Sequence, residues 1–258
     1  MDVVILCGGM GTRLSEETIT KPKPMVEIGG KPILWHIMKY YSSYGFNRFI
    51  LALGYKSNYI KEYFYNYKIS NSDFTIDLNP ENKPKFHNVG NESNWKITFI
   101  DTGLNTLKGA RIKKIEKNKK SENFHLTYGD GLCNVNLKKL VNFHLSHNKI
   151  ASVTAVRPPS RFGEMLIKGD KVEEFEEKSQ MNSGYINGGF FIVNKKIMNF
   201  LSDNEDCDFE FGPLQEIVKI NELNAFKHDD FWQCMDNVRE RDFLNKLFKE
   251  NNAPWVKW

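Results

Sequence analysis

The chain has 258 residues, and its 36 basic residues are nearly balanced by 32 acidic ones, which leaves a formal net charge of +4. A charge this small, with no dominant basic tract, argues against a nucleic-acid partner. No apolar run approaches the roughly 20 residues that span a bilayer, so we expect no membrane segment. The four cysteines form no C-x-x-C pair, which argues against a zinc site or a disulfide framework and fits a cytoplasmic location.

The first residues predict a buried strand that runs into a phosphate-binding loop. The run 3–6 consists of Val, Ile and Leu and is followed by glycines, which is typical of a central strand buried on both faces. Gly8, Gly9 and Gly11 lack the Cβ atoms that would keep a triphosphate away from backbone N–H groups. Neither the dinucleotide fingerprint G-x-G-x-x-G nor the P-loop G-x-x-x-x-G-K-[ST] is present.

Two cationic side chains accompany this loop. Arg13 offers a planar fork of donors that suits phosphate oxygens, whereas Lys23 is a compact charge. Lys23 stands between Pro22 and Pro24, whose fixed backbone angles restrict the segment. We expect both cations to face the same anion. The structural alternative, a tight strand-to-helix turn with a solvated lysine, leaves the arginine and the Pro-Lys-Pro sequence unexplained.

Strand and helix patterns alternate after the loop. Apolar residues recur at helical spacing over 33–41, a second strand is predicted over 49–53, and a helix begins at Ser57. This alternation predicts a mostly parallel sheet with helices on both faces, and ligands bind beyond the carboxyl ends of such strands. Residues 79–95 are polar and interrupt the alternation, so we expect a surface excursion that is functional or an interface.

A candidate metal ligand follows another predicted strand. The strand over 124–128 runs into Gly129-Asp130-Gly131. Asp-Gly alone would indicate a turn, but a carboxylate at the carboxyl end of a central strand, downstream of a phosphate loop, is suited to hold Mg²⁺. From residue 150 the chain changes to shorter β-type segments, up to 172–177, which we expect to extend the sheet and to form the acceptor side of the cleft.

The motifs resemble those of a known family. The run Leu6 to Leu14 with Pro22-Lys23-Pro24 resembles the signature of the sugar-phosphate nucleotidylyltransferases, and 15–18 with 31–39 is similar to the glucose-1-phosphate cytidylyltransferase branch. Since the tail 253–258 is similar as well, the resemblance spans the chain. It implies an α/β, Rossmann-like three-layer nucleotidyltransferase fold, with a mostly parallel central sheet, helices on both faces and a small extra β region.

We expect a single nucleotidyltransferase domain over 1–258, because the hydrophobic content of 40% is enough for a substantial core. Residues 1–130 would mainly bind the nucleotide, with 79–95 as the surface excursion. Residues 150–236 would mainly bind the sugar phosphate, and 237–258 would form a C-terminal helix and tail.

The resemblance also assigns site residues. It implies nucleotide contacts for Leu6, Cys7, Gly8, Gly9, Gly11, Thr12, Arg13, Lys23, Thr106, Arg111, Tyr128 and Gly129. It implies that Mg²⁺ is held by Asp130 and Asp236, and that the catalytic residues are Arg13, Lys23 and Asp130. For Thr106 a capped helix start is the structural alternative, and for Asp236 it is a helix N-cap, a role that is compatible with metal binding.

The sugar phosphate would be bound by Gly163, Glu177, Lys178, Asn187 and Gly188. The glycines permit close approach of a flat pyranose, Glu177 and Asn187 can hydrogen-bond its hydroxyls, and Lys178 can hold the phosphate. Strand-end turns with solvated charges are the alternative. The chain departs from the family at Ser179 and Cys234, where proline is usual, and the first departure loosens the expected placement of Lys178.

These assignments imply a reaction. CTP and α-D-glucose 1-phosphate would give CDP-glucose and pyrophosphate by Mg²⁺-assisted in-line attack on the α-phosphate, in a cytoplasmic homo-oligomer whose product feeds lipopolysaccharide O-antigen synthesis. UTP or dTTP in place of CTP, another sugar 1-phosphate, and a non-catalytic nucleotide-sugar sensor remain as alternatives. The presence of Arg13, Lys23, Asp130 and Asp236 together argues against the sensor.

Overall fold

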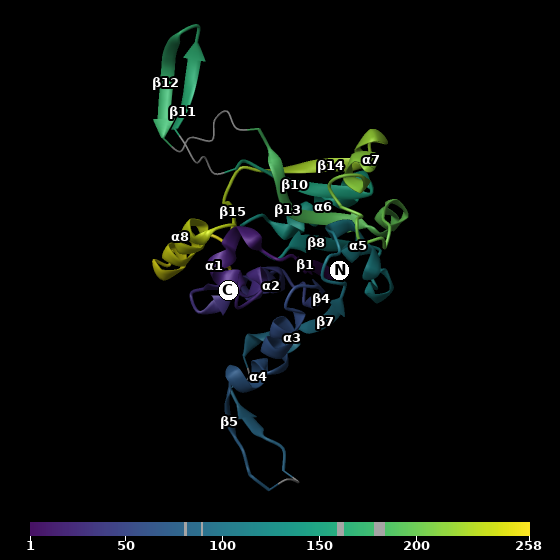
Figure 1. The fold of residues 1–258 in the computed structure, drawn as a ribbon, viewed down its shortest axis with the longest axis vertical. Coiled ribbons are helices and arrows are strands. Elements are labelled where there is room, and N and C mark those ends of the chain that lie inside the picture. The colour runs from purple at the N-terminus through teal and green to yellow at the C-terminus, as the bar shows by residue number, and fades with distance from the viewer. Residues whose placement is uncertain (80–81, 89, 159–162, 178–183) are drawn as a thin grey trace.

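A seven-stranded sheet forms the centre of the computed structural model, which describes residues 1–258 apart from 80–81, 89, 159–162 and 178–183. The strands in spatial order are β14 (Leu223–His228), β10 (Ala151–Val156), β13 (Ile186–Asn194), β8 (Asn123–Tyr128), β1 (Val3–Cys7), β4 (Arg48–Leu53) and β7 (Lys96–Asp101). Only β13 runs antiparallel to its neighbours in this sheet. The predicted mostly parallel sheet is confirmed (Figure 1).

The side chains of β1 alternate between two cores, one on each face of the sheet. Val3 and Ile5 pack into a core that includes residues of α2 (Ile33–Ser43) and α6 (Leu137–His147). Val4 packs into the opposite core, which includes residues of α5 (Lys108–Lys114) and α7 (Pro213–Lys219). Successive side chains of a strand point to opposite faces, so an uninterrupted apolar run fits a strand covered by helices on both sides.

Apart from two projecting hairpins, the other α-helices and β-strands are short or peripheral. They are α1 (Ser15–Thr18), α3 (Ser57–Tyr65), α4 (Tyr67–Ser70), α8 (Val238–Lys249), β2 (Glu27–Ile28), β3 (Lys31–Pro32), β9 (Gly131–Cys133) and β15 (Trp232–Cys234). Among the described residues, no helix is long and apolar enough to cross a bilayer. The predicted helix over 33–41 and the predicted strands over 49–53 and 124–128 are confirmed.

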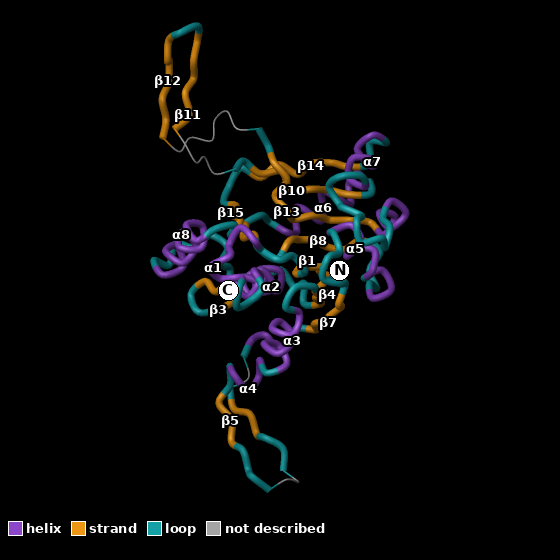
Figure 2. The backbone as a smooth tube through the Cα atoms, viewed as in Figure 1, coloured by secondary structure: helices purple, strands orange, loops and turns teal. Residues whose placement is uncertain are grey.

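Two hairpins project from opposite ends of the body (Figures 1 and 2). One pairs β5 (Asp73–Thr75) with β6 (Lys85–His87), so the excursion contains a strand and begins before residue 79. The other pairs β11 (Gly163–Lys168) with β12 (Lys171–Glu177). The expectation that 172–177 extends the main sheet is wrong. Gly169 has a φ of 62°, and a left-handed residue between two strands favours a local hairpin over pairing with distant strands.

Candidate active site

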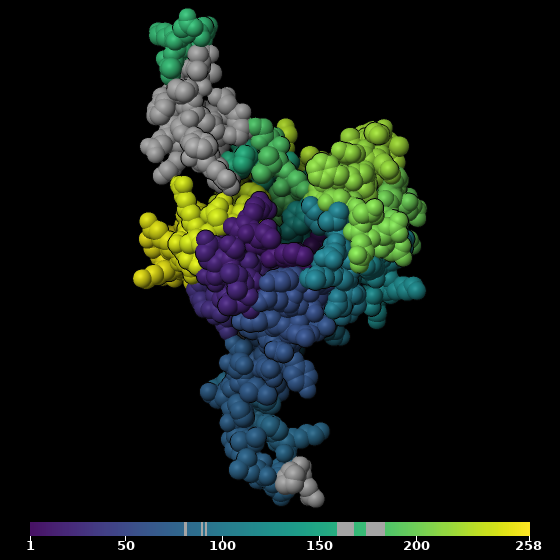
Figure 3. Space-filling view, in the orientation of Figure 1, coloured from purple at the N-terminus to yellow at the C-terminus, as the bar shows by residue number. Residues whose placement is uncertain are grey.

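A cavity of about 530 Å³ opens at the carboxyl ends of β1 and β8. Figure 3 shows this side of the molecule, which is hollowed between the purple N-terminal segment and the yellow-green segment after residue 200. Sequence-predicted residues from several distant segments line it: Leu6, Cys7, Gly8, Gly9, Gly11, Thr12, Arg13, Lys23, Thr106, Arg111, Tyr128, Gly129, Asp130, Asn187, Gly188 and Asp236. The fold therefore brings the predicted nucleotide and metal residues to one place.

The glycine loop is shaped for a ligand as well as for a turn. Gly11 has a φ of 66°, and a Cβ there would lie 2.9 Å from Lys23 Cβ, so the turn and the lysine segment both require glycine. A Cβ at Gly9 would meet nothing within 4 Å. Packing within the chain therefore does not require glycine at Gly9, and the predicted approach of a phosphate group to the backbone would explain it.

Lys23 lies between the two aspartates predicted to bind metal. Its Nζ donates to Asp130 Oδ2 at 2.5 Å and to Asp236 Oδ1 at 2.6 Å. Arg13 Nη1 lies 2.7 Å from Asp236 Oδ2. Burial alone would lower the pKa of Lys23, but the charge and hydrogen bonds of the two aspartates outweigh it and raise the pKa. Burial alone would raise the pKa of Asp236, but Lys23 and Arg13 outweigh it and lower the pKa.

The same geometry tests whether these carboxylates suit a cation. Asp130 and Asp236 approach a single positive group from different elements, one after β8 and the other after β15. Met235 N donates to Asp130 O at 2.8 Å, which fixes the two segments side by side. Two convergent carboxylates at the mouth of an open cavity fit a hard cation such as Mg²⁺, which takes few protein ligands and completes its shell with water and phosphate oxygens.

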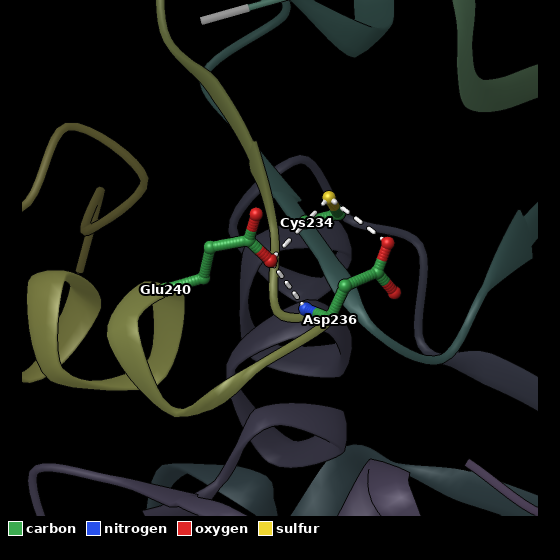
Figure 4. A group of neighbouring side chains, drawn as sticks. All are labelled: Cys234, Asp236 and Glu240. Carbon is green, nitrogen blue, oxygen red and sulfur yellow. Dashed lines mark hydrogen bonds between the residues drawn. The ribbon is translucent and has the colours of Figure 1, made fainter. Parts of the chain in front are cut away.

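The backbone of Asp236 is held by the first turn of α8 (Figure 4). Glu240 Oε2 accepts from Asp236 N at 2.6 Å, and Asn237 Oδ1 accepts from Glu240 N at 3.0 Å. The N-cap is therefore Asn237, and the alternative that assigned this role to Asp236 is wrong. This leaves the Asp236 carboxylate directed at the cavity cations.

Cys234 forms, with Asp236 and Glu240, the only group of three or more potential metal ligands found among the described residues. Its Sγ lies 3.7 Å from Asp236 Oδ2 and 4.0 Å from Glu240 Oε2. Burial, followed by the neighbouring carboxylates, raises the pKa of Cys234 to about 12. The residue is thus a neutral thiol at physiological pH, which donates weakly to the carboxylates.

Arg111 lines the cavity, but its guanidinium is occupied by the protein. Its two terminal nitrogens donate to five oxygen atoms at distances between 2.6 and 3.1 Å. The acceptors are Gly8 O, Leu53 O, Thr102 Oγ1, Gly103 O and Leu104 O. Thr106 Oγ1 lies nearby and accepts from Lys114 Nζ at 3.2 Å. Direct nucleotide contacts of Arg111 and Thr106 stay predictions.

The opposite wall carries a chain of polar contacts around Tyr128. The Tyr128 hydroxyl donates to Glu210 Oε1 at 2.5 Å and accepts from Asn187 Nδ2 at 3.0 Å. Lys108 Nζ lies 2.6 Å from Glu210 Oε2. Sequence reasoning missed Lys108 and Glu210 as site residues, and it did not assign Trp232, whose Nε1 donates to Gly188 O at 2.8 Å. Trp232 lies close to Asp236 in the sequence, which could have indicated that it lines the site. No neighbouring residue gives such an indication for Glu210.

The predicted sugar-phosphate residues have different outcomes. A Cβ at Gly188 would lie 2.7 Å from Val156 Cγ1, so packing against β10 explains this glycine without a pyranose. Gly163 and Glu177 are paired with each other in the hairpin that projects from the body. Lys178 lies outside the described residues. The roles of these residues therefore stay predictions.

Comparisons with known proteins give the family. A family model described as "Nucleotidyl transferase" matches residues 2–235. The glucose-1-phosphate cytidylyltransferase of Salmonella typhimurium is 46% identical over 259 residues, which cover 100% of both chains. The "Probable glucose-1-phosphate cytidylyltransferase" of Bacillus subtilis is 41% identical, again over 100% of both. A crystal structure of UDP-glucose pyrophosphorylase with UDP-glucose has a TM-score of 0.68 at 16% identity, covers 97% of this chain and 98% of its own, and supports the fold alone.

The parallel sheet, the glycine loop at its carboxyl edge and the paired carboxylates define an α/β enzyme that acts on a nucleotide. The chain belongs to the nucleotidyl transferase family, as the resemblance of its motifs predicted.

Proposed function

We propose that this chain transfers the cytidylyl group of CTP to α-D-glucose 1-phosphate and releases pyrophosphate. The observation that carries the proposal is full-length similarity, at 46% identity, to a glucose-1-phosphate cytidylyltransferase. The site supports it, because the glycine loop, Arg13, Lys23, Asp130 and Asp236 all line one cavity. A sensor that had lost turnover would have no need for this complete set of charges.

The reaction needs positioning and charge stabilisation more than covalent chemistry. A phosphate oxygen of the sugar phosphate attacks the α-phosphorus of CTP, a new P–O bond forms, and the bond to the β-phosphate oxygen breaks in line, so that pyrophosphate leaves. The nucleophile is already an anion and needs no general base. Lys23 and Arg13 supply positive charge where negative charge develops, and the loop N–H groups orient the phosphates.

We propose Mg²⁺ as the cofactor, held by Asp130 and Asp236. When bound, the ion would neutralise the phosphates and hold them for in-line transfer. The chain's own part is to present two carboxylates at one position and to keep Lys23 within reach of both. Because Lys23 balances the carboxylates in the structure, it is already beside the place where phosphate charge arrives.

We also propose a cytoplasmic homo-oligomer that supplies CDP-glucose for lipopolysaccharide O-antigen synthesis. Four free cysteines are compatible with a reducing compartment. The β5–β6 hairpin and its surroundings expose apolar side chains, among them Leu78 at 88% and Ile76 at 56%, and such a projecting apolar surface suits contact with another subunit. Light scattering of the purified chain measures the oligomeric state.

The test of the reaction is pyrophosphate release with Mg²⁺ and glucose 1-phosphate, run separately with CTP, UTP, dTTP, ATP and GTP. We expect turnover mainly with CTP. Turnover only with another nucleotide would retain the nucleotidyl transfer and refute the cytidylyl specificity. A second series with CTP and other sugar 1-phosphates tests the acceptor, and silence in both series, together with tight binding of CDP-glucose, would favour the sensor.

A further inference from the structure

Two ion pairs join the segment after the glycine loop to the segment after β15. Arg13 stands two positions before α1 and Asp236 two positions before α8, and Arg13 Nη1 lies 2.7 Å from Asp236 Oδ2 at the cavity. We call this contact the inner pair. The outer pair has the opposite polarity and joins Glu17 of α1 to Arg241 of α8, which lie side by side (Figure 1). Neither member of the outer pair is among the described residues that line the cavity.

A phosphate group and a metal ion would compete for the inner pair. Both carboxylate oxygens of Asp236 already face cations, Oδ1 that of Lys23 at 2.6 Å and Oδ2 that of Arg13. A metal ion brings a third positive charge, and since like charges repel, one of the two cations should move away. The side chain of Arg13 is 73% exposed and that of Lys23 is 9% exposed, so Arg13 can leave with the smaller loss of packing. This step rests on the proposed function.

The outer pair is linked to the glycine loop through α1. Thr18 is buried, and its hydroxyl lies 3.1 Å from Gly11 O and 3.0 Å from Leu14 O. A Cβ at Gly11 would lie 2.9 Å from Thr18 Cγ2, so the helix and the loop are in close contact. Since α1 has four residues, it depends on tertiary contacts for its stability. A contact that holds Glu17 therefore also restrains the loop that carries Arg13.

The rest of α8 is docked by other contacts. Leu244 is buried in the core, and Phe248 packs against the same core. Asn245 Oδ1 accepts from Gly29 N at 2.9 Å. These residues follow Arg241 along the helix, at the spacing that places side chains on one face. Loss of the outer pair should therefore leave α8 in place and release only its first turn from α1.

Each member of the outer pair has a second charged neighbour on its own segment. Lys21 Nζ lies 3.6 Å from Glu17 Oε2, and Asp242 Oδ1 lies 2.7 Å from Arg241 Nη2. Of these three contacts, the one between Glu17 and Arg241 joins the two segments. Its two side chains are 23% and 24% exposed, so water screens this contact less than it would screen a fully exposed pair.

We propose that Glu17 and Arg241 are positioning residues, whose ion pair holds the glycine-loop segment against the start of α8 when Arg13 and Asp236 turn to a phosphate group and a metal ion. The inner pair can then separate while Asp236 stays beside Lys23. Because the outer pair keeps the two segments together, the entropy cost of ordering them is not added to the cost of binding.

The first experiment is hydrogen exchange of the ligand-free protein at the amides of residues 19–21, which donate to Ser15 O and Glu17 O. We expect exchange to be about fivefold faster in Glu17→Gln and in Arg241→Gln. The double variant should exchange no faster than either, because both changes remove one contact. Arg241→Lys retains the charge and should retain most of the protection. Asp242→Asn, which leaves the outer pair in place, is the matched control and should exchange as the wild type does.

Two results of this experiment would overturn the proposal. Effects that multiply in the double variant would show that Glu17 and Arg241 do not act through one contact. Exchange that rises equally throughout the sheet would show a loss of global stability in place of local positioning. The experiment needs neither Mg²⁺ nor a nucleotide, so its outcome is independent of the proposed reaction.

The second experiment measures the Mg²⁺ concentration that gives half-maximal pyrophosphate release from CTP and glucose 1-phosphate. We expect Arg241→Gln to raise this concentration about fivefold, because Asp236 is held less closely, and to lower turnover at saturating Mg²⁺ by less than about twofold. A purely structural residue would lower the unfolding midpoint and leave this concentration unchanged, and that result would overturn the proposal. If the wild type turns over no nucleotide while the exchange changes as expected, the proposed function fails and the contact between the two segments stands.

Discussion

The two walls of the cavity are built in different ways. The proposed nucleotide side consists of loops that follow adjacent parallel strands, β1, β4 and β7, and Arg111 donates hydrogen bonds to all three. The proposed acceptor side combines β13 with β15 and the segment around Glu210, and these distant segments meet there through side-chain contacts such as Tyr128 with Glu210 and Asn187. The loops of the first wall thus follow neighbouring parallel strands, whereas the second wall also needs side-chain contacts between segments that are distant in the sequence.

This difference suits the two walls to two proposed tasks, binding of the nucleotide and selection of the acceptor. A wall that follows from strand pairing would be preorganised for the ligand proposed for it, the phosphates and the base of a nucleotide. A wall that rests on a few side chains can change its acceptor by few substitutions, which fits a fold that carries many specificities. The two walls meet at Lys23, Asp130 and Asp236, so changes there should affect both substrates.

The largest effect is expected at this meeting point. Asp130→Asn keeps the shape but removes a carboxylate that balances Lys23 and is the proposed metal ligand. We expect a loss of turnover on the order of a thousandfold. The measurement is pyrophosphate release at saturating CTP and glucose 1-phosphate, with the exposed Asp203→Asn as the control. Activity within a fewfold of wild type would remove Asp130 from the mechanism.

Lys23→Met should have the next largest effect, about a hundredfold in turnover. Its loss also leaves Asp130 and Asp236 facing each other without the shared cation, so added Mg²⁺ should raise the thermal unfolding midpoint of this variant more than that of the wild type. Lys21→Met is the matched control, since Lys21 pairs with Glu17 at 3.6 Å and is not among the described residues that line the cavity. If Mg²⁺ raised the thermal unfolding midpoints of Lys23→Met and of the wild type equally, the ion and the Lys23 ammonium group would not share a position.

Glu210→Gln sharpens the comparison between the walls. Glu210 accepts from Tyr128 and pairs with Lys108, and Tyr128 in turn accepts from Asn187, so neutralising Glu210 should disturb the proposed acceptor side more than the glycine loop. We expect the KM for glucose 1-phosphate to rise by about tenfold and the KM for CTP to stay within about twofold. The exposed Glu216→Gln should change neither constant. An equal rise in both constants would show that the walls are not separate.

The smallest effects are expected from buried histidines of the core, which change the stability of the protein and not its reaction. Burial lowers the pKa of His36 and of His144 to about 4 and that of His125 to about 3. The unfolded chain therefore binds more protons than the folded one between pH 6.5 and about 4, and the free energy of unfolding falls as the pH falls through this window. Denaturant titrations at pH 7 and pH 5 measure the loss.

His125→Leu tests one part of this pH dependence. Both ring nitrogens of His125 are buried without a hydrogen-bond partner, so the apolar replacement should stabilise the protein by about 1 kcal/mol at pH 7. The free energy of unfolding should also fall by about 2 kcal/mol less between pH 7 and pH 5 in this variant than in the wild type. A wild-type slope in His125→Leu would show that this ring does not contribute.

The sequence was informative where the site is built from local segments. An apolar run followed by glycines predicts a strand and its loop, and Asp130 comes directly after another such strand, so their meeting at one sheet edge follows from parallel pairing. Asp236 was assigned by resemblance, because its neighbours alone indicate a helix start. The N-cap is in fact the next residue, Asn237, a shift of one position that helix propensity does not resolve.

The features of the fold and the site that the sequence did not predict depend on contacts between distant segments. Tyr128 donates to Glu210 although the two residues are 82 positions apart. No periodicity in the sequence predicts this contact. Arg111 donates to backbone carbonyl groups of three loops. Every residue has a backbone carbonyl group, so the sequence does not indicate these contacts. The β11–β12 hairpin was expected in the main sheet because apolar alternation predicts a strand but does not name its partner.

The most direct test of the proposed reaction follows the phosphorus atoms of CTP. CTP labelled at the α-phosphate or, separately, at the γ-phosphate is incubated with the protein, Mg²⁺ and glucose 1-phosphate, and the products are separated and identified by mass. We expect that the α-label enters CDP-glucose and the γ-label leaves as pyrophosphate, both only when glucose 1-phosphate is present. An α-label that ends in CMP, or product formation that does not require the sugar phosphate, would contradict it.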